Sequence, residues 1–485
     1  MQAMTRSNVQ ELREPRFDLL RLPLVGGLLR HPATRWTSRL LLFAVALAMM
    51  LHGWFGSQLA PKNLSTLLTW VHYRGLLVLA LLVVGNVFCY ACPMVLLRDL
   101  ARRVAHPALH WPRRLRNKWT AAALFVGVLF CYELFDLWGD PWATAWLIAG
   151  YFGVAILVDV TFRGATFCKY LCPVGQFNFI ASTVSPLEVG VRDSGICADC
   201  VGKECITGAA RSPARPDQRG CELKLFQPRK VGNLDCTFCL DCVYACPYEN
   251  VGIFPRTPGA ELDVPGYRAG IGRPAERMDL AFLSTLFAFG ALLNAFGMVS
   301  PIYAVERWLA QLLGTTHEAP VLGLLFVVAL IVEPLLLMGA SAWAYRRLTG
   351  RGESLARIGM RYAYSLVPLG FGIWLSHYTF HLLTGALTFV PVVQSLLTWQ
   401  GTPLLGEPRW QLGGLAAETV LPIELGFLML GFAVTLAVTW RLATAEVPER
   451  PWRAFAPWAF LHTLLIVTAT WLLSQPMEMR GTFLG

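Results

Sequence analysis

The chain has 485 residues, a mean hydropathy of +0.49 and 55% hydrophobic residues, and only 15% of its residues are charged. This composition argues against an ordinary soluble domain, which carries about 25% charged residues, and it indicates membrane spans. The net charge of +10 does not indicate a nucleic-acid binder, because the basic residues gather in blocks beside apolar runs. In that position they serve membrane topology or contact anionic lipid.

Apolar runs of roughly 20 residues, the length at which an α-helix crosses a bilayer, recur along the chain. We expect nine spans: Leu40–Phe55, Leu76–Leu97, Thr120–Trp138, Trp142–Val160, Leu280–Val299, Val321–Ala344, Tyr362–Thr384, Val420–Trp440 and Trp458–Ser474. The predicted fold class is therefore a mainly α, polytopic membrane helix bundle with a polar domain inserted between its two halves.

Basic residues are unevenly divided between the segments that connect these runs. Residues 1–39 contain seven arginines, and residues 98–118 contain seven basic residues and one acid. The alternate connections contain few Lys or Arg: 57–74, 139–141, 300–320 and 385–419. Because basic loops stay in the cytoplasm, we expect a multi-pass protein of the inner (cytoplasmic) membrane, with its N-terminus inside and its C-terminus outside.

Polarity divides the chain into four parts. A basic cytoplasmic leader (1–39) precedes a four-span membrane domain (40–165), and a five-span membrane domain (276–485) ends the sequence. Residues 166–275 lie between them, are rich in Cys, Gly and Pro, and contain no run long enough to span. Because this segment follows an even number of spans, we expect it to be cytoplasmic.

Two cysteine–proline pairs lie at the predicted cytoplasmic ends of spans in the first half of the chain. Cys89-x2-Cys92-Pro93 lies at the inner end of the second predicted span, and Cys168-x3-Cys172-Pro173 follows the fourth on the same side. Four thiols at one membrane face can hold a third cluster or a metal, or can act as a thiol pair. The alternative is a set of buried small apolar residues beside prolines that end helices.

The most specific pattern in the chain is Cys236-x2-Cys239-x2-Cys242-x3-Cys246-Pro247. Three thiolates on one tight loop hold three corners of an iron–sulfur cubane, and the fourth cysteine of such a run ligates the other cluster. Zinc sites instead present two separated pairs, so the spacing favours iron–sulfur chemistry.

A looser group precedes this run: Cys197-x2-Cys200-x4-Cys205, then Cys221. Since ligands cross over in a two-cluster ferredoxin, we predict two [4Fe–4S] clusters in a ferredoxin-like α+β domain over 166–275. One cluster is assigned to Cys197, Cys200, Cys205 and Cys246, and the other to Cys236, Cys239, Cys242 and Cys221. The alternative for Cys221, which follows a long insertion, is a lone loop thiol.

Ionisable side chains within the predicted spans form a further candidate site. His377 and His381 share one face of the seventh span, Glu333 lies near the middle of the sixth, and His52 lies near the outer end of the first. They could hold haem b, a metal ion or a quinone, and a haem would need a second ligand such as His52. The alternative is hydrogen bonding between helices. No catalytic residue is assigned.

The cysteine motifs together resemble one class of membrane protein. FCYACP (88–93), FCKYLCPVGQ (167–176), CADCVGKEC (197–205) and CTFCLDCVYACP (236–247) are similar to the motifs of the NapH, NosR and CcoG class of membrane-bound polyferredoxins. The resemblance covers about residues 40–256. It implies electron transfer linked to respiratory or anaerobic metabolism, maturation of a metal enzyme, or quinol oxidation. The five C-terminal spans have no counterpart that we can match in NapH.

We therefore expect an integral-membrane iron–sulfur protein that passes single electrons between cytoplasmic clusters and a membrane quinone or an outer-face redox partner. It would act as a carrier or as a subunit of an oxidoreductase complex. The expected partners are membrane lipid, a redox protein or subunit, and a quinone, but not nucleic acid. Two alternatives are a factor that reduces a metal during assembly of a respiratory metalloenzyme, and a transporter with regulatory clusters.

Overall fold

The computed structural model describes residues 17–209, 218–262, 272–399 and 402–477. Residues 1–16 of the predicted leader lie outside the described residues, as do 210–217 and 263–271 of the predicted ferredoxin-like domain. The chain forms two compact units. The first, here called the cysteine unit, consists of Met1–Phe43, Ala80–Asn117 and Ile156–Pro274. The second, the helical unit, consists of Ala44–Leu79, Lys118–Ala155 and Ala275–Gly485.

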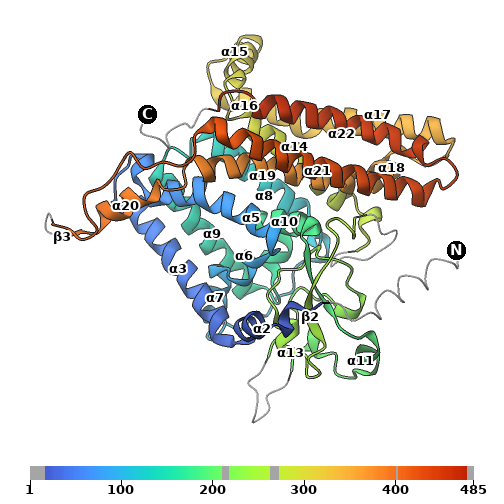
Figure 1. Cartoon of the computed structure of the whole chain (residues 1–485), viewed down its shortest axis with the longest axis horizontal. Helices are drawn as coiled ribbons and strands as arrows, with labels where there is room; N and C mark the ends of the chain where they lie inside the picture. The colour runs from blue at the N-terminus through green and yellow to red at the C-terminus, as the bar shows by residue number, and fades with distance from the viewer. Residues whose placement is uncertain (1–16, 210–217, 263–271, 400–401, 478–485) are drawn as a thin grey trace. The chain divides into compact units, whose positions relative to one another are not determined.

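Most of the chain is helical, and seven helices among the described residues are long and apolar enough to cross a membrane (Figure 1). They are Pro32–Phe55 (α3), Leu64–Val83 (α4, η4 and α5), Pro141–Thr161 (α9), Met278–Phe296 (α14), Glu318–Thr349 (α16, η10 and α17), Ala417–Glu446 (α21) and Pro451–Leu473 (α22). These helices indicate a multi-pass membrane protein, as the hydropathy pattern predicts.

Two other predicted spans have different counterparts. The third corresponds to a shorter apolar helix, Trp119–Leu134 (α8), which has 16 residues. The seventh corresponds to a pair of helical segments, Leu355–Thr384 and Phe389–Leu396, that are bent by 49°. The number of nine spans therefore stays a prediction.

The predicted bounds of the second span, Leu76–Leu97, are wrong. The helix lies earlier, at Leu64–Val83, and breaks at Gly85, whose φ of +83° is a conformation that glycine adopts without cost. The sequence prediction places 57–74 in a connection between two spans. In the structure, polar groups of this stretch have partners within the protein, since Trp70 Nε1 donates to the Leu137 carbonyl at 3.0 Å and Thr66 Oγ1 donates to the Ala60 carbonyl at 2.6 Å.

The cysteine unit combines short helices with a small sheet. Strands β1 (Leu187–Val191) and β2 (Val251–Pro255) pair antiparallel, with Val189 opposite Ile253. The buried Asp18 carboxylate accepts from Ile253 N and forms an ion pair with Arg192 at 2.6 Å, which ties the N-terminal segment to this sheet. The helices are α2 (Pro23–Arg30), α6 (Val87–Tyr90), α7 (Pro93–Ala101), η6 (Phe167–Leu171), α10 (Pro173–Ala181), α11 (Ser194–Asp199), α12 (Glu204–Thr207) and α13 (Asp241–Ala245).

The core of the helical unit is built around α19 (Val367–Thr384), which is buried over most of its length. It packs against α14 and α21, and α22 packs against α21 and α17 (Figure 1). Gly372 and Gly431 allow the close approach of α19 and α21, because a Cβ on Gly431 would lie 2.6 Å from the Pro368 carbonyl oxygen. The remaining elements are α15 (Pro301–Leu313), α18 (Leu355–Tyr362), η11 (Ala363–Leu366), α20 (Phe389–Leu396) and the strand pair β3 (Thr398–Trp399) and β4 (Thr402–Pro403).

Candidate functional site

The loop that carries the tightest cysteine run is shaped by left-handed backbone. Asp235, Phe238 and Leu240 have φ values of 66°, 51° and 60°. Each such residue costs roughly 1–2 kcal/mol, so the fold must hold this conformation in place. The repeated reversals keep the loop curled, and α13 begins directly after Leu240. The thiols of this loop therefore face one enclosed space.

That space is a cavity of about 270 Å³ whose lining includes four cysteines: Cys221, Cys236, Cys239 and Cys242. Its other walls are mainly apolar, with Phe238 and Leu240 among them. Burial, the largest cause, raises the pKa of Cys242 well above its ordinary value, and the neighbouring thiols raise it further. Burial also raises the pKa of Cys221 and Cys239, so these thiols ionise together with Cys242 only where a positive centre compensates their charge.

A second cavity, of about 370 Å³, is lined by the other four cysteines of this region: Cys197, Cys200, Cys205 and Cys246. Burial raises the pKa of Cys205 to about 11. Asn250 supplies two hydrogen bonds to sulfur here, from its side-chain Nδ2 to Cys197 Sγ at 3.2 Å and from its backbone N to Cys246 Sγ at 3.3 Å. Such donors stabilise thiolate ligands.

Each cavity therefore receives three cysteines from one stretch of chain and a fourth from another. Cys246, the last cysteine of the tight run, lines the cavity of the earlier group, and Cys221 lines the cavity of the tight run. A backbone hydrogen bond from Cys221 N to the Cys205 carbonyl, at 2.8 Å, links the two groups directly.

The two cysteine–proline pairs, Cys89/Cys92 and Cys168/Cys172, also lie close to one another. Burial is the largest cause that raises the pKa of Cys89, and the charges of Cys92 and Cys172 raise it further. Burial likewise raises the pKa of Cys168, with contributions from Cys172 and Cys92. Cys89 and Cys168 are thus each within electrostatic range of Cys92 and Cys172, and we call these four residues the third cysteine group.

Proline explains how the third cysteine group is built. Cys92 and Cys172 are the N-cap residues of α7 and α10, and Pro93 and Pro173 occupy the first helical position, where a missing N–H costs nothing. The Cys172 sulfur accepts a hydrogen bond from Gly175 N at 3.0 Å. The positive end of each helix therefore favours the thiolate form of its capping cysteine.

Two buried amides connect the third cysteine group to the cavity of the tight run. Asn86 Nδ2 donates to the Cys236 carbonyl at 3.2 Å, and its Oδ1 accepts from Asn178 Nδ2 at 3.2 Å. Asn178 Nδ2 also lies 3.6 Å from Cys89 Sγ. Both asparagines are completely buried. The sequence does not reveal this bridge, because a lone Asn has no recognisable spacing.

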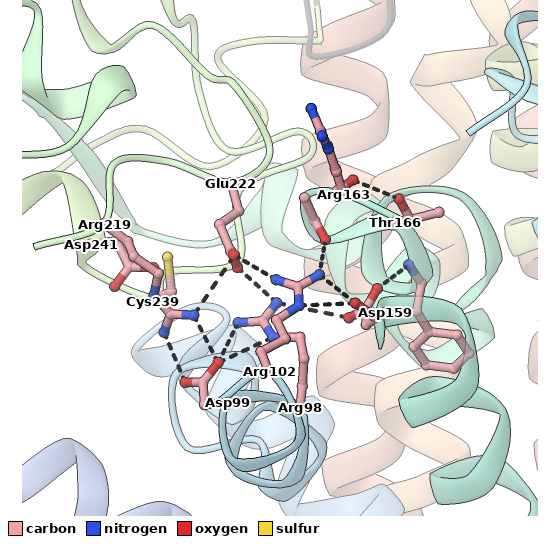
Figure 2. A network of polar contacts seen from close by, with 12 residues as sticks. Arg98, Asp99, Arg102, Asp159, Arg163, Thr166, Arg219, Glu222, Cys239 and Asp241 are labelled. Atoms are coloured by element: carbon pink, nitrogen blue, oxygen red, sulfur yellow. Dashed lines mark hydrogen bonds and ion pairs between the residues drawn. The ribbon is translucent and has the colours of Figure 1, made fainter. Parts of the chain in front are cut away.

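A network of ion pairs lies beside the third cysteine group (Figure 2). Arg98 contacts Glu222 at 2.7 Å and Asp159 at 3.8 Å, and Arg102 contacts Glu222 at 3.0 Å. The sequence indicates only a topology signal in the basic residues of 98–118, yet Arg98 is 4% exposed and takes part in this buried network.

Asp99 is the second acidic centre of this network (Figure 2). Arg219 approaches it through two hydrogen bonds, of 2.7 and 2.8 Å, and Arg39 lies at 3.5 Å. Burial alone would raise the pKa of Asp99. The hydrogen bonds from Arg219 and the charges of Arg98 and Arg39 outweigh burial and lower this pKa to about 2. Burial raises the pKa of Cys92, and the positive charges of Arg39 and Arg98, which are in electrostatic range, oppose this rise in part.

The ionisable residues of the predicted spans lie in the helical unit. The His377 and His381 rings, on α19, are 4.8 Å apart. His52 Nδ1 accepts from Leu64 N at 3.0 Å, which is a local structural role. Glu333 begins α17, beside Pro334. Among the described residues, no group of three or more His, Cys, Asp or Glu side chains could hold a single metal ion.

Comparison with curated proteins confirms the predicted resemblance to NosR-type membrane electron-transfer proteins over part of the chain. A stretch of 104 residues is 34% identical to the "Putative electron transport protein YccM" of Escherichia coli and covers 20% of this chain and 26% of that protein. A stretch of 180 residues is 28% identical to the "Regulatory protein NosR" of Pseudomonas aeruginosa and covers 32% of this chain and 23% of that protein.

The chain thus matches about a quarter of the length of these curated relatives. No family model and no solved structure matches the chain significantly.

Proposed function

We propose that this protein transfers single electrons at a membrane through [4Fe–4S] clusters in its two four-cysteine cavities. One observation carries the proposal. Cys246 joins Cys197, Cys200 and Cys205 at one cavity, and Cys221 joins Cys236, Cys239 and Cys242 at the other. This exchange of the last cysteine is typical of two-cluster ferredoxins. The name of one relative, an electron transport protein, agrees with a role in electron transfer.

The donor sets fit such clusters better than they fit a single metal ion. Each thiolate of a cubane ligates a different iron, so the sulfurs surround a space and do not meet at one point. The cysteines line two pockets that each hold four sulfurs around a shared space, while no tight single-ion group occurs among the described residues. When bound, the clusters would supply reversible one-electron transfer.

The surrounding residues would hold and tune these centres. Asn250 donates to the sulfurs of Cys197 and Cys246, and donors of this kind raise the reduction potential of a cluster by stabilising its added negative charge. The cavity of Cys221, Cys236, Cys239 and Cys242 is the more enclosed, since three of its four cysteines are buried and all four of the other are only partly so. The two centres would therefore differ in potential.

We propose that the third cysteine group, Cys89, Cys92, Cys168 and Cys172, holds a further iron–sulfur centre. Its two N-cap thiols and the nearby Arg98 and Arg39 favour bound thiolates. The hydrogen-bonded Asn86 and Asn178 connect this group to Cys236. Electrons would then be exchanged with a membrane quinone or with a redox protein, which remain proposed partners.

Anaerobic purification tests this function. We expect about eight irons and eight acid-labile sulfides per chain for two clusters, with about four more of each if the third cysteine group binds a cubane. Reduction should produce the EPR signals of reduced [4Fe–4S] clusters. A protein that contains zinc in place of iron, or no acid-labile sulfide, would contradict the proposal. The replacement Cys92→Ser should remove only the contribution of the third group.

We further propose an inner-membrane location with the cysteine unit in the cytoplasm. Arginine-rich connections support this orientation, because basic loops remain inside. Reporter fusions test it: alkaline phosphatase is active only outside, and GFP fused in the same way fluoresces only inside. Fusion after Gly314 should give active phosphatase, and fusion after Gly350 should give GFP fluorescence. The reverse pattern would invert the topology.

A further inference from the structure

A strongly basic connection in the cysteine unit takes no part in holding the cysteines described above. Residues 103–116, which follow α7, contain four arginines and two histidines and no acidic residue. The arginines, all exposed, are Arg103, Arg113, Arg114 and Arg116. None of these four forms an ion pair with a described residue. The 103–116 loop therefore presents uncompensated positive charge to its surroundings.

The 103–116 loop is held in a defined shape by the segment that follows α9. Leu109 pairs with Phe162 in a parallel bridge. The Leu109 N–H donates to the Thr161 carbonyl at 3.3 Å, and the Leu109 carbonyl accepts from Arg163 N at 2.9 Å. The exposed Arg163 side chain donates from Nε to the Pro107 carbonyl at 3.2 Å. Arg163 thus fixes the loop and adds a further positive charge to it.

An aromatic pair connects this loop to the third cysteine group. Trp111 Nε1 donates to the Leu115 carbonyl at 2.8 Å, which fixes the indole within the loop. The indole stacks on the Tyr170 ring, with the ring centroids 6.1 Å apart and the planes inclined by 7°. Tyr170 lies on η6, two residues after Cys168 and two before Cys172. The stack therefore leads from the loop to the segment that carries two thiols of the third cysteine group.

Apolar side chains lie among the charges of the loop. Val104, Leu109 and Leu115 are 87%, 55% and 42% exposed. Interfaces between proteins combine an apolar centre with a polar rim, and redox encounters use small ones. Anionic lipid would also attract the arginines, but it requires neither a fixed loop shape nor an aromatic contact with the third cysteine group. These features favour a protein partner.

We propose that the 103–116 loop is the docking surface of an acidic soluble one-electron carrier protein, which exchanges electrons with the third cysteine group. Opposite charge steers such a carrier to the loop and raises its association rate. In each encounter one electron moves between the two iron–sulfur centres, so that one is oxidised as the other is reduced, and no bond or proton changes. This exchange rests on the proposed function, because it requires an iron–sulfur centre at the third cysteine group.

Binding of an acidic [2Fe–2S] ferredoxin to the full-length protein in uncharged detergent tests the docking surface. Replacing three arginines together, by Arg113→Gln, Arg114→Gln and Arg116→Gln, should lower the association rate constant about tenfold at low ionic strength. The rate constant of the wild type should fall steeply with added salt, and that of the variant only weakly. An unchanged rate constant in the variant would overturn the proposal.

The matched control removes the same charge from exposed arginines of the helical unit, by Arg347→Gln, Arg357→Gln and Arg450→Gln together. It should bind ferredoxin as fast as the wild type does. An equal loss in both triple variants would mean that only net charge matters, and would overturn the docking surface. If the wild type bound no ferredoxin but retained more phosphatidylglycerol than the loop variant, the loop would be a lipid-binding surface, and the proposal would be wrong.

Iron analysis and reduction kinetics separate the docking surface from the proposed function. Cys92→Ser protein should bind ferredoxin like the wild type but lose fast reduction by reduced ferredoxin in a stopped-flow experiment. Fast reduction of this variant would overturn the third cysteine group as the site of exchange. Iron-free protein that still binds ferredoxin through the loop would refute the clusters and leave the docking surface intact. Iron-loaded protein that does not bind it would refute the docking surface alone.

Discussion

The cysteines of the cysteine unit and the histidines of the helical unit are both metal-binding residue types, but the two units hold them differently. In the cysteine unit, thiols separated by two to four residues lie on curled loops and helix caps and surround shared cavities. In the helical unit, His377 and His381 form a pair on one helix, while His52 has a local hydrogen-bond partner. Short loop spacing thus dictates convergence, whereas a position on a long helix does not.

The largest effect is expected on bound iron, when one cysteine is removed from either cavity. Cys239→Ser and Cys205→Ser should each remove about four of eight irons, because a cubane rarely persists with three thiolates. Iron and sulfide analysis, with EPR, would measure the loss. The control is Cys131→Ser, on α8 of the helical unit, which should keep all its iron. Full iron in either cavity variant would contradict the predicted ligand sets.

Breaking the ion-pair network beside the third cysteine group should reduce stability. Arg98→Met removes one ion-pair partner from both Glu222 and Asp159, while Arg102 still contacts Glu222 at 3.0 Å. Loss of a partner in a buried network costs up to about 3–5 kcal/mol. Denaturation in detergent, followed by circular dichroism, would measure it. The control is Arg103→Met, because Arg103 is exposed. A loss equal to that of the control would mean that the network contributes little.

Asp99 should make stability depend on pH at the acidic end. Its pKa is lowered to about 2 in the folded protein, from an ordinary value of 3.8. A lowered carboxyl pKa stabilises the fold above the ordinary value, and this contribution of about 2 kcal/mol disappears as the pH falls from about 4 to 2. The stability difference between the wild type and Asp99→Asn should therefore shrink over this interval. A difference that stays constant would refute the lowered pKa.

The smallest loss of stability is expected for the substitution of His377, in the helical unit. Both ring nitrogens of His377 lack a hydrogen-bond partner among the described residues, so His377→Leu should change stability by less than about 1 kcal/mol. Its iron content and visible absorption spectrum should not change. His462→Leu, which removes contacts of 3.1 Å to Ser365 and Thr439, should destabilise the protein more. Loss of a haem band in the His377 variant would break the contrast between the two units.

The sequence predicts features that depend on local patterns and misses those that depend on contacts between distant residues. Hydropathy locates the helices, and the spacing of the tight cysteine run points to a shared cavity. The predicted second span is misplaced, since the helix lies at Leu64–Val83 and the polar groups of Thr66 and Trp70 within it are hydrogen-bonded to other parts of the chain. The Arg98–Glu222 pair joins residues more than 120 positions apart. Such contacts leave no local pattern.

The Asn86–Asn178 bridge has a consequence for how charge would move through the cysteine unit. A continuous chain of covalent and hydrogen bonds runs from the Cys236 carbonyl through two amides to the Cys89 sulfur. Electronic coupling through such a connected path decays less steeply than coupling across an open gap. If both amides were replaced by leucine, the thiols would keep their positions but lose this conduit, and the two centres would exchange electrons more slowly while each kept its own spectrum.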